Sequence, residues 1–218
     1  TRLEQAQGKV ARIKGKAILE DARKQFEELG VSEIALTQRH GTLVGTLAEY
    51  EQRADLVVLG KRGEHAGAAQ SPLGGNLEEA VRISIRPVLV AAREFKPIER
   101  FLIPFDNSAS ARKAVEFAAS SPLFAGLECH VLMVGRTDAA HEQALAEAKD
   151  QLARAGFKPA AALKPGSAAP VIAEYAKSNG IDLLAMGAYG HSHIREFIVG
   201  STTTKVVRSC AIPVLMFR

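Results

Sequence analysis

The chain has 218 residues, of which 47% are hydrophobic and 24% are charged, a composition that supports a buried core and excludes a largely disordered protein. The formal net charge of +4 is small and spread along the sequence, so it does not indicate a nucleic-acid-binding surface. No apolar run is long enough to span a bilayer and the N-terminus lacks a secretory pattern. We therefore expect a cytoplasmic protein that binds neither membrane nor nucleic acid. Cys129 and Cys210 are far apart and flanked by apolar residues, which favours buried, reduced thiols over a disulfide or a metal pair.

The first elements can be predicted from apolar spacing. Residues 1–29 predict one helix or two abutting helices, because apolar residues recur every three or four positions between charged ones. Gly30 is typical of a helix C-terminus. A short strand at residues 34–36, a helix at 42–50 and a buried strand at 56–59 follow.

The sequence then repeats itself. Ala-Glu-Tyr at 48–50 returns at 173–175, Pro-Val-Leu at 87–89 returns at 213–215, and the pair Gly60 and Gly63 returns as Gly187 and Gly190. Two tandem copies of one fold explain this order, with domains at residues 1–96 and 97–218. Alternating short strands and helices predict an α/β protein in which each copy is an open, parallel, Rossmann-like sheet with helices on both faces.

The two copies are unequal. The second copy opens with a strand at 101–105, a turn at 106–108, a helix, a strand at 129–134 and a long helix at about 139–155. The first copy has no counterpart to its opening strand, helix and second strand, so we predict that the first domain is N-terminally incomplete. Either the chain begins inside this domain or the domain is degenerate. A half-sheet would leave apolar faces and an edge uncovered, so we favour a longer parent protein.

The second copy also carries a candidate phosphate site, at residues 182–208. A buried strand at 183–186 breaks into glycine at Gly187 and Gly190, and Gly200 is followed by a run of hydroxyl residues that begins with Ser201 and opens a helix. Glycine allows close backbone approach to an anion, and the free amides of a helix N-terminus point at it. An ordinary turn and helix cap would use the same residues, so both interpretations stay open. The spacing is not that of a Walker loop.

Gly187, Gly190, Gly200 and Ser201 match, position for position, the ATP-binding motif of the universal stress protein family, which this chain resembles. The resemblance implies an adenine-nucleotide α-hydrolase-like fold, ATP (or AMP or ADP) as the ligand, and Mg²⁺ beside the phosphates. It implies that the end of the first strand holds the adenosine and that the glycine loop holds the ribose and phosphates. The residues so implied are Pro104, Phe105, Asp106, Met186, Gly187, Gly190, Gly200, Ser201, Thr202 and Thr203.

Asp106, the glycines of the first copy and the two histidines after Gly190 each allow more than one interpretation. Asp106 has the carboxylate that ribose hydroxyls need, but Asp-Asn-Ser is also a turn and capping sequence, and both roles can coexist. In the first copy ten residues separate Gly63 from Gly74, which is followed by Gly75 and Asn76, so hydroxyl donors are lost. Bare amides can still hold a phosphate, so a nucleotide in the first copy is disfavoured but stays open. His191 and His193 give a weak metal signal, and a charge contribution to the triphosphate suits them better.

The last strand of each copy predicts how the copies meet. These strands begin at Pro87 and Pro213, and the family resemblance implies that such strands pair across a two-fold axis. We predict an intramolecular pseudo-dimer through residues 87–91 and 213–217, with contacts at Val88, Val90, Val214 and Met216; a homo-oligomer stays open.

No catalytic order of Ser, His and Asp or of Cys and His stands out, so a regulatory binding module for the stress response is favoured over an enzyme. The alternatives are a slow ATPase or autophosphorylating protein, with Ser201 or a neighbouring threonine as acceptor, and a scaffold that binds no nucleotide.

Overall fold

A computed structural model describes residues 2–60, 75–188 and 201–218. The chain divides into two compact units, Thr1–Thr42 and Leu43–Arg218, and each is described by itself. In the part of the chain that the structure describes, no helix is both long enough and apolar enough to cross a membrane.

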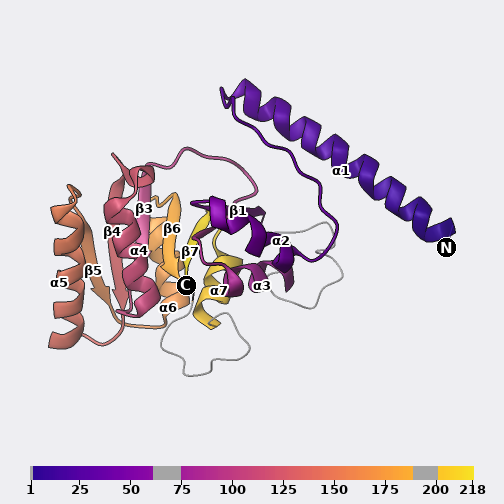
Figure 1. Cartoon of the computed structure of the whole chain (residues 1–218). Helices are drawn as coiled ribbons and strands as arrows, with labels where there is room; N and C mark the ends of the chain where they lie inside the picture. The colour runs from indigo at the N-terminus through magenta and orange to yellow at the C-terminus, as the bar shows by residue number, and fades with distance from the viewer. Residues whose placement is uncertain (1, 61–74, 189–200) are drawn as a thin grey trace. The chain divides into compact units, whose positions relative to one another are not determined.

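The first unit consists of helix α1 (Arg2–Glu28) and the extended segment that follows it (Figure 1). The helix ends at Glu28, and Gly30 after it has a φ of 82°, in the left-handed region. Two backbone bonds close the helix end, from Gly30 N to Glu27 O at 2.9 Å and from Val31 N to Phe26 O at 2.9 Å. This is the Schellman arrangement that the sequence position of Gly30 predicts.

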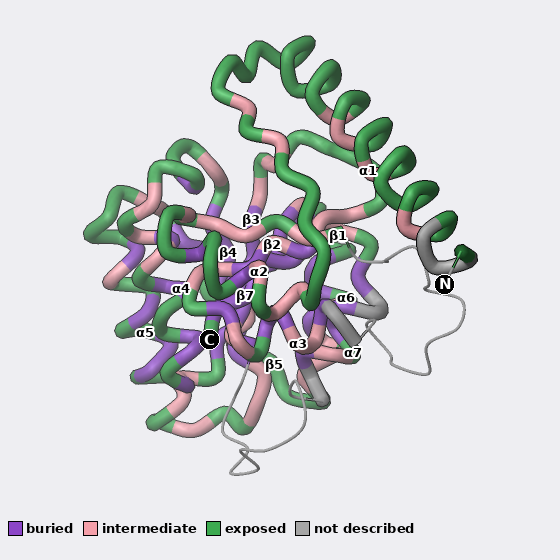
Figure 2. Tube along the Cα trace, turned by 45° about the vertical axis from the view of Figure 1, so that its right-hand side comes forward, coloured by how far each residue is buried: buried purple, intermediate pink, exposed green. Residues whose placement is uncertain are grey.

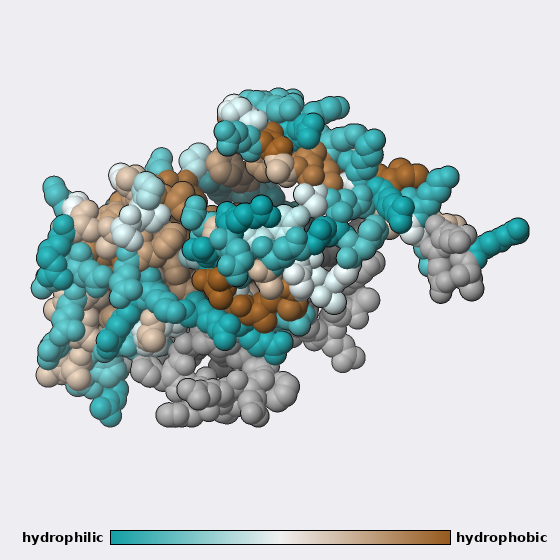
Figure 3. Space-filling view, viewed as in Figure 1, coloured by the Kyte–Doolittle hydropathy of each residue, from teal (hydrophilic) through white to brown (hydrophobic). Residues whose placement is uncertain are grey.

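The predicted strand at residues 34–36 is absent, and this prediction was wrong. A strand requires a hydrogen-bonded neighbour, and the only regular element described in this unit is α1. The segment is tied to the helix by a side chain instead, because Gln38 Nε2 donates to Ala11 O at 3.2 Å. Apolar side chains of α1, among them Val10, Ile13 and Ile18, remain more than half exposed (Figures 2 and 3).

The second unit is built on one seven-stranded sheet with helices on both faces (Figure 1). Its elements in chain order are α2 (Leu43–Tyr50), a short 3-10 helix (Glu51–Arg53), β1 (Val57–Gly60), α3 (Gly75–Ile83), β2 (Val88–Ala91), β3 (Arg100–Pro104), α4 (Ala109–Ser120), a second 3-10 helix (Pro122–Phe124), β4 (Glu128–Val134), α5 (Ala139–Arg154), β5 (Ala160–Lys164), α6 (Ala168–Ser178), β6 (Leu183–Gly187), α7 (Ser201–Ser209) and β7 (Val214–Phe217). The strand order is β1-β2-β7-β6-β3-β4-β5. The protein is therefore an α/β protein with a mostly parallel sheet, as its alternating elements predict.

Each face of the sheet has its own core. Helices α4 and α5 pack on one face, with Phe101, Val131 and Leu215 from the strands. Helices α3, α6 and α7 pack on the other face. They contact strand residues such as Leu102 and Leu132, which directly follow Phe101 and Val131 in the sequence. Because successive strand residues point to opposite faces, strands with apolar runs supply both cores.

The strands at 88–91 and 214–217 are the second and third strands of this sheet, and they join β1 and β2 to the other five strands. β2 pairs with β7 in antiparallel register, Val88 with Met216, Leu89 with Leu215 and Val90 with Val214. All other strand pairs of the described sheet are parallel. The two strands thus pair as expected, while the interpretation of this pairing as a pseudo-dimer of two domains stays a prediction. The proposed boundary between residues 96 and 97 falls in the connection from β2 to β3.

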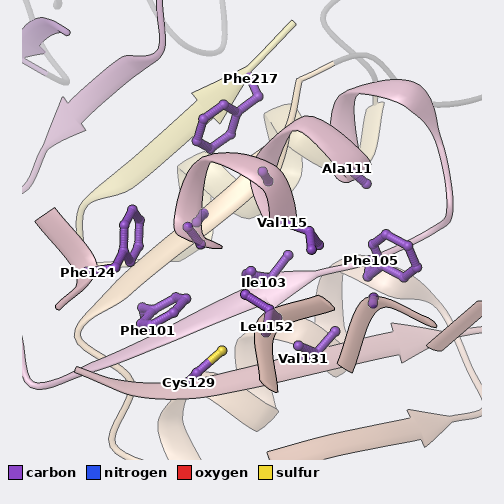
Figure 4. Close-up of a cluster of buried hydrophobic side chains, with 14 of the residues drawn as sticks. Phe101, Ile103, Phe105, Ala111, Val115, Phe124, Cys129, Val131, Leu152 and Phe217 are labelled. Atoms are coloured by element: carbon purple, nitrogen blue, oxygen red, sulfur yellow. The ribbon is translucent and has the colours of Figure 1, made fainter. Parts of the chain in front are cut away.

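An aromatic cluster fills the core beneath α4 (Figure 4). Phe101 of β3 meets Phe124 edge to face, with ring centroids 4.5 Å apart, and Cys129 of β4 lies in the same cluster. Burial raises the pKa of the Cys129 thiol from 9.0 to about 12, because the thiolate would lose its hydration there. Cys210 is also buried and free, so both thiols are reduced and interior, as expected.

The raised pKa of Cys129 predicts an inert thiol. In a Cys210→Ala background, we expect the native protein at pH 8 to react with Ellman's reagent about a thousandfold more slowly than the unfolded chain, the ratio of thiolate fractions at the two pKa values. The folded protein holds its proton more tightly, so the stability that this proton confers is complete below pH 9 and is lost as pH rises towards 12. Equal labelling rates with and without guanidinium would contradict the buried position.

Candidate functional site

The five parallel strands β3 to β7 end at one edge of the described sheet. β3 lies between β6 and β4. The chain leaves β3 for α4 on one face and leaves β6 for α7 on the other face. In open α/β sheets, ligands bind beyond the carboxyl ends of the strands at the point where successive connections take opposite faces. The β3 and β6 ends are that point in this protein.

The turn after β3 is held by its own side chains. Phe105 is buried in the α4 core, and its backbone N donates to Leu132 O at 2.9 Å. Asp106 is exposed, and its Oδ1 accepts a bond of 3.0 Å from Ser108 N. Asn107 takes a φ of 62°, a conformation that asparagine tolerates. The turn role that the sequence allowed for Asp106 is therefore present, and its carboxylate lies at the carboxyl edge.

Ser108 begins helix α4 as its N-cap. Its Oγ accepts from Ala111 N at 3.2 Å and lies 3.3 Å from Ser110 Oγ. Both serines are buried at the carboxyl edge, and neither was among the residues predicted for the site. The signal was present in the sequence, since a serine directly before an alanine-rich helical stretch is a common N-cap.

Gly187 ends β6 against the first turn of α4. A Cβ built on Gly187 would overlap Ser110 Oγ and would lie 2.9 Å from Ala111 N and 3.0 Å from the Ser110 carbonyl carbon. Two of these atoms are backbone and have no freedom to move aside. Glycine is required here by the close approach of strand and helix, whatever binds at the edge.

Thr203 ties α7 to the same place. Its side chain is 4% exposed, and its Oγ1 donates to Ala188 O at 3.2 Å and lies 3.4 Å from Gly187 O. The hydroxyl proton is thus directed at the end of β6. Met186 is also buried, with its side chain in the core between the sheet and α7, so it faces away from a ligand at the edge.

The structure brings together the end of β3, the end of β6 and the start of α7, and hence Pro104, Asp106, Gly187 and Thr203. Ser201 and Thr202 form the first positions of α7, but their side chains lie outside the described residues. Gly190, Gly200, His191 and His193, and Gly63 and Gly74 in the first copy, also lie outside them. Among the residues that are described, no cluster of three or more His, Cys, Asp or Glu side chains is placed to hold a metal ion.

The loop after β4 adds charged groups that the sequence analysis did not consider. Asp138 caps α5 and accepts from His141 Nδ1 at 2.6 Å and from His141 N at 3.1 Å. The imidazole bond, followed by the backbone bond, lowers the pKa of Asp138 to about 2. Arg136, which is exposed, lies 3.3 Å from the same carboxylate. An arginine and a histidine therefore stand at the carboxyl edge beside β3.

The close contact at Gly187 predicts a large effect of one methyl group. We expect Gly187→Ala to lower the free energy of unfolding by about 1–3 kcal/mol in urea titrations, because the methyl group would meet the backbone of α4. Gly8→Ala is the control, since a Cβ at Gly8 meets nothing within 4 Å. A Gly187→Ala protein as stable as the parent would show that strand and helix are further apart.

Thr203 is predicted to stabilise the folded protein even when no ligand is bound. Thr203→Val should lower the free energy of unfolding by about 1–2 kcal/mol, because two carbonyl groups at the end of β6 lose their donor. Thr203→Ser, which keeps the hydroxyl, should retain most of the stability. If both variants unfold like the parent protein and differ only when nucleotide is added, the hydroxyl serves a ligand instead.

Comparisons with known proteins agree with this architecture. The model of the universal stress protein family matches residues 97–218. Universal stress protein Slr1230 from Synechocystis sp. is 39% identical over 219 aligned residues, which cover 99% of this chain and 76% of that protein. A universal stress protein structure from Archaeoglobus fulgidus aligns with a TM-score of 0.75 at 20% identity, over 95% of this chain and 77% of that chain. Universal stress protein MJ0577 is a protein of Methanocaldococcus jannaschii. Its solved structure aligns with a TM-score of 0.51 at 23% identity, over 55% of this chain and 95% of that chain. At these identities the solved structures show the fold alone.

Proposed function

Because the chain belongs to the universal stress protein family, we propose that it is a regulatory protein of the stress response that binds an adenine nucleotide at the carboxyl edge of β3 and β6. ATP is the proposed ligand, with AMP and ADP as its smaller relatives. The observation that carries the proposal is the convergence of two helix N-termini, those of α4 and α7, on the end of β6; Gly187 and Thr203 only make this junction possible. Helix N-termini at a strand end favour a phosphate-bearing ligand.

The proposed contacts divide between the two ends of the nucleotide. The exposed carboxylate of Asp106 accepts hydrogen bonds from the ribose, beside the backbone of Pro104 and Phe105. The backbone at Met186 and Gly187 lies next to the ribose, and the phosphates lie towards Gly190, Gly200 and the N-terminus of α7. Ser201 and Thr202 supply hydroxyl donors there. Mg²⁺ would neutralise phosphate charge, with water completing its coordination.

Thr203 is the one hydroxyl of the proposed set whose geometry is described. Its proton points to the carbonyl groups of Gly187 and Ala188, so we assign it to positioning α7 and leave the phosphate contacts to Ser201 and Thr202.

We propose binding, without turnover, as the principal activity. A base that activates water needs an accessible, polar position. The Asp138 and His141 pair is engaged in capping α5, and the Cys129 thiol is buried with a raised pKa. Slow ATP hydrolysis or autophosphorylation on Ser201 is the alternative, and it would appear as ADP formation that is lost in Ser201→Ala. The pairing of β2 with β7 supports, in the same proposal, a pseudo-dimer within one chain. A cytoplasmic location completes the proposal, and a homo-oligomer stays open.

Calorimetric titration of ATP and Mg²⁺ into nucleotide-free protein tests the proposal. We expect one site with a dissociation constant on the order of 1 μM or tighter. Gly190→Val and Gly200→Val should abolish the heat, because a branched side chain blocks the approach of backbone to phosphate. Gly8→Val, in α1 with open space around it, is the control. Absence of heat in the parent protein would favour the scaffold alternative, and unchanged affinity in both loop variants would refute the phosphate assignment.

Asp106 allows its two roles to be separated. Asp106→Asn keeps an oxygen that accepts from Ser108 N and should leave the free energy of unfolding nearly unchanged. Loss of the charge should weaken ATP binding about tenfold or more, as expected for a hydrogen bond to a charged group. Asp106→Ala should reduce both stability and affinity. If Asp106→Asn binds ATP like the parent protein, the residue serves the turn alone.

A further inference from the structure

An open cleft of about 560 Å³ lies beside the junction of β2 and β7. Its walls come from the connection between α3 and β2, from one side of α4 and from the end of β7. We call it the β2–β7 cleft, and the residues that line it include Ile85, Arg86, Lys113, Glu116, Phe117 and Phe217. None of the residues proposed for the nucleotide lines it.

The apolar part of the cleft contains an aromatic pair. Phe117 of α4 and Phe217 of β7 have ring centroids 5.3 Å apart, with their planes inclined by 55°. Phe217 is buried and Phe117 is partly exposed, so the Phe117 ring is accessible from the cleft. Ile85 is 68% exposed on the other wall. A flat apolar molecule would gain burial against these three side chains.

The charges of the cleft are mainly positive. Arg86, Lys113 and Arg218 line it with Glu116 as the single acidic residue of the lining. Two of the cations are held in place: Arg86 Nε donates to Glu51 O at 3.1 Å, and Lys113 Nζ donates to Arg218 O at 2.6 Å. Each keeps further N–H donors beyond the one used in these bonds. The cleft therefore offers fixed donors for one negative group next to an apolar wall.

We propose that the β2–β7 cleft binds a small organic anion with a flat apolar body, of the aromatic carboxylate class. The carboxylate lies between Lys113 and Arg86, and the ring lies against Ile85 and Phe117. The volume is within the range of small-molecule pockets. A ligand there would touch the segment that leads into β2 and the end of β7 at once, and would favour the β2–β7 pairing.

The test uses 2-naphthoate as the probe and the methyl resonance of Ile85 as the reporter. We expect a saturable shift of this resonance with a dissociation constant of about 1 mM, ordinary for a ligand of this size. The methyl group of Ile103, which is fully buried in the α4 core, should not move, and it reports that the fold is intact. The neutral analogue 2-naphthalenemethanol should bind more weakly than the carboxylate.

Charge variants supply the decisive comparison. Lys113→Glu should weaken naphthoate binding about threefold to tenfold and leave the neutral analogue unaffected. Lys149→Glu is the matched control, because Lys149 is exposed on α5 and does not line the cleft. Saturating ATP should leave the naphthoate shift in place.

Three results would overturn the assignment: an Ile85 resonance that does not respond to millimolar naphthoate, equal losses in the two lysine variants, or displacement of naphthoate by ATP. The last would show that ATP and naphthoate compete for one site. Because the reporter is independent of ATP, failure of the proposed nucleotide function leaves this test unchanged.

Discussion

The antiparallel pairing of β2 with β7 is the interaction on which the second unit depends. β1 and β2 form only a two-stranded parallel pair by themselves, and such a pair has too few hydrogen bonds and too little covered surface to be stable. The antiparallel ladder, in which Val88 is opposite Met216 and Val90 is opposite Val214, attaches that pair to the five strands of residues 97–218. The same register carries α3 onto the face that α6 and α7 occupy. One ladder therefore joins β1 and β2 to the other five strands in a single sheet.

The pairing of β2 with β7 also holds the two candidate sites in place. β7 is fixed on one side by β2 and on the other by β6, so the end of β6 and the Gly187 junction are held from both directions. The β2–β7 cleft lies on the outer side of β7, against α4, and the proposed nucleotide edge lies at the N-terminus of the same helix. α4 therefore borders both sites.

The sequence predicted the parts of this architecture that depend on local chemistry. Apolar runs located six of the seven strands of the described sheet, all but β5, and glycine located the end of α1. It failed at residues 34–36, because an apolar triplet becomes a strand only beside a partner strand, and partners are distant in sequence. The contact between Gly187 and the first turn of α4 spans more than seventy residues and has no local signal. Ser108 and Ser110 were missed because a capping serine looks the same with and without a site beside it.

The glycine and hydroxyl motif consequently contains two kinds of residue. Gly187 and Thr203 are explained by the folded chain itself: one permits β6 to touch α4, and the other ties α7 to the end of β6. A protein could retain both without binding any nucleotide, so their presence supports the fold more strongly than the ligand. Asp106 is intermediate, since one carboxylate oxygen accepts the turn bond to Ser108 N and the side chain is nevertheless exposed. The test of nucleotide binding therefore rests on Gly190, Gly200, Ser201 and Thr202, because the two glycines and the side chains of the two hydroxyl residues lie outside the described residues. Substitutions at these four positions therefore distinguish a nucleotide-binding site from a strand and helix junction that only stabilises the fold.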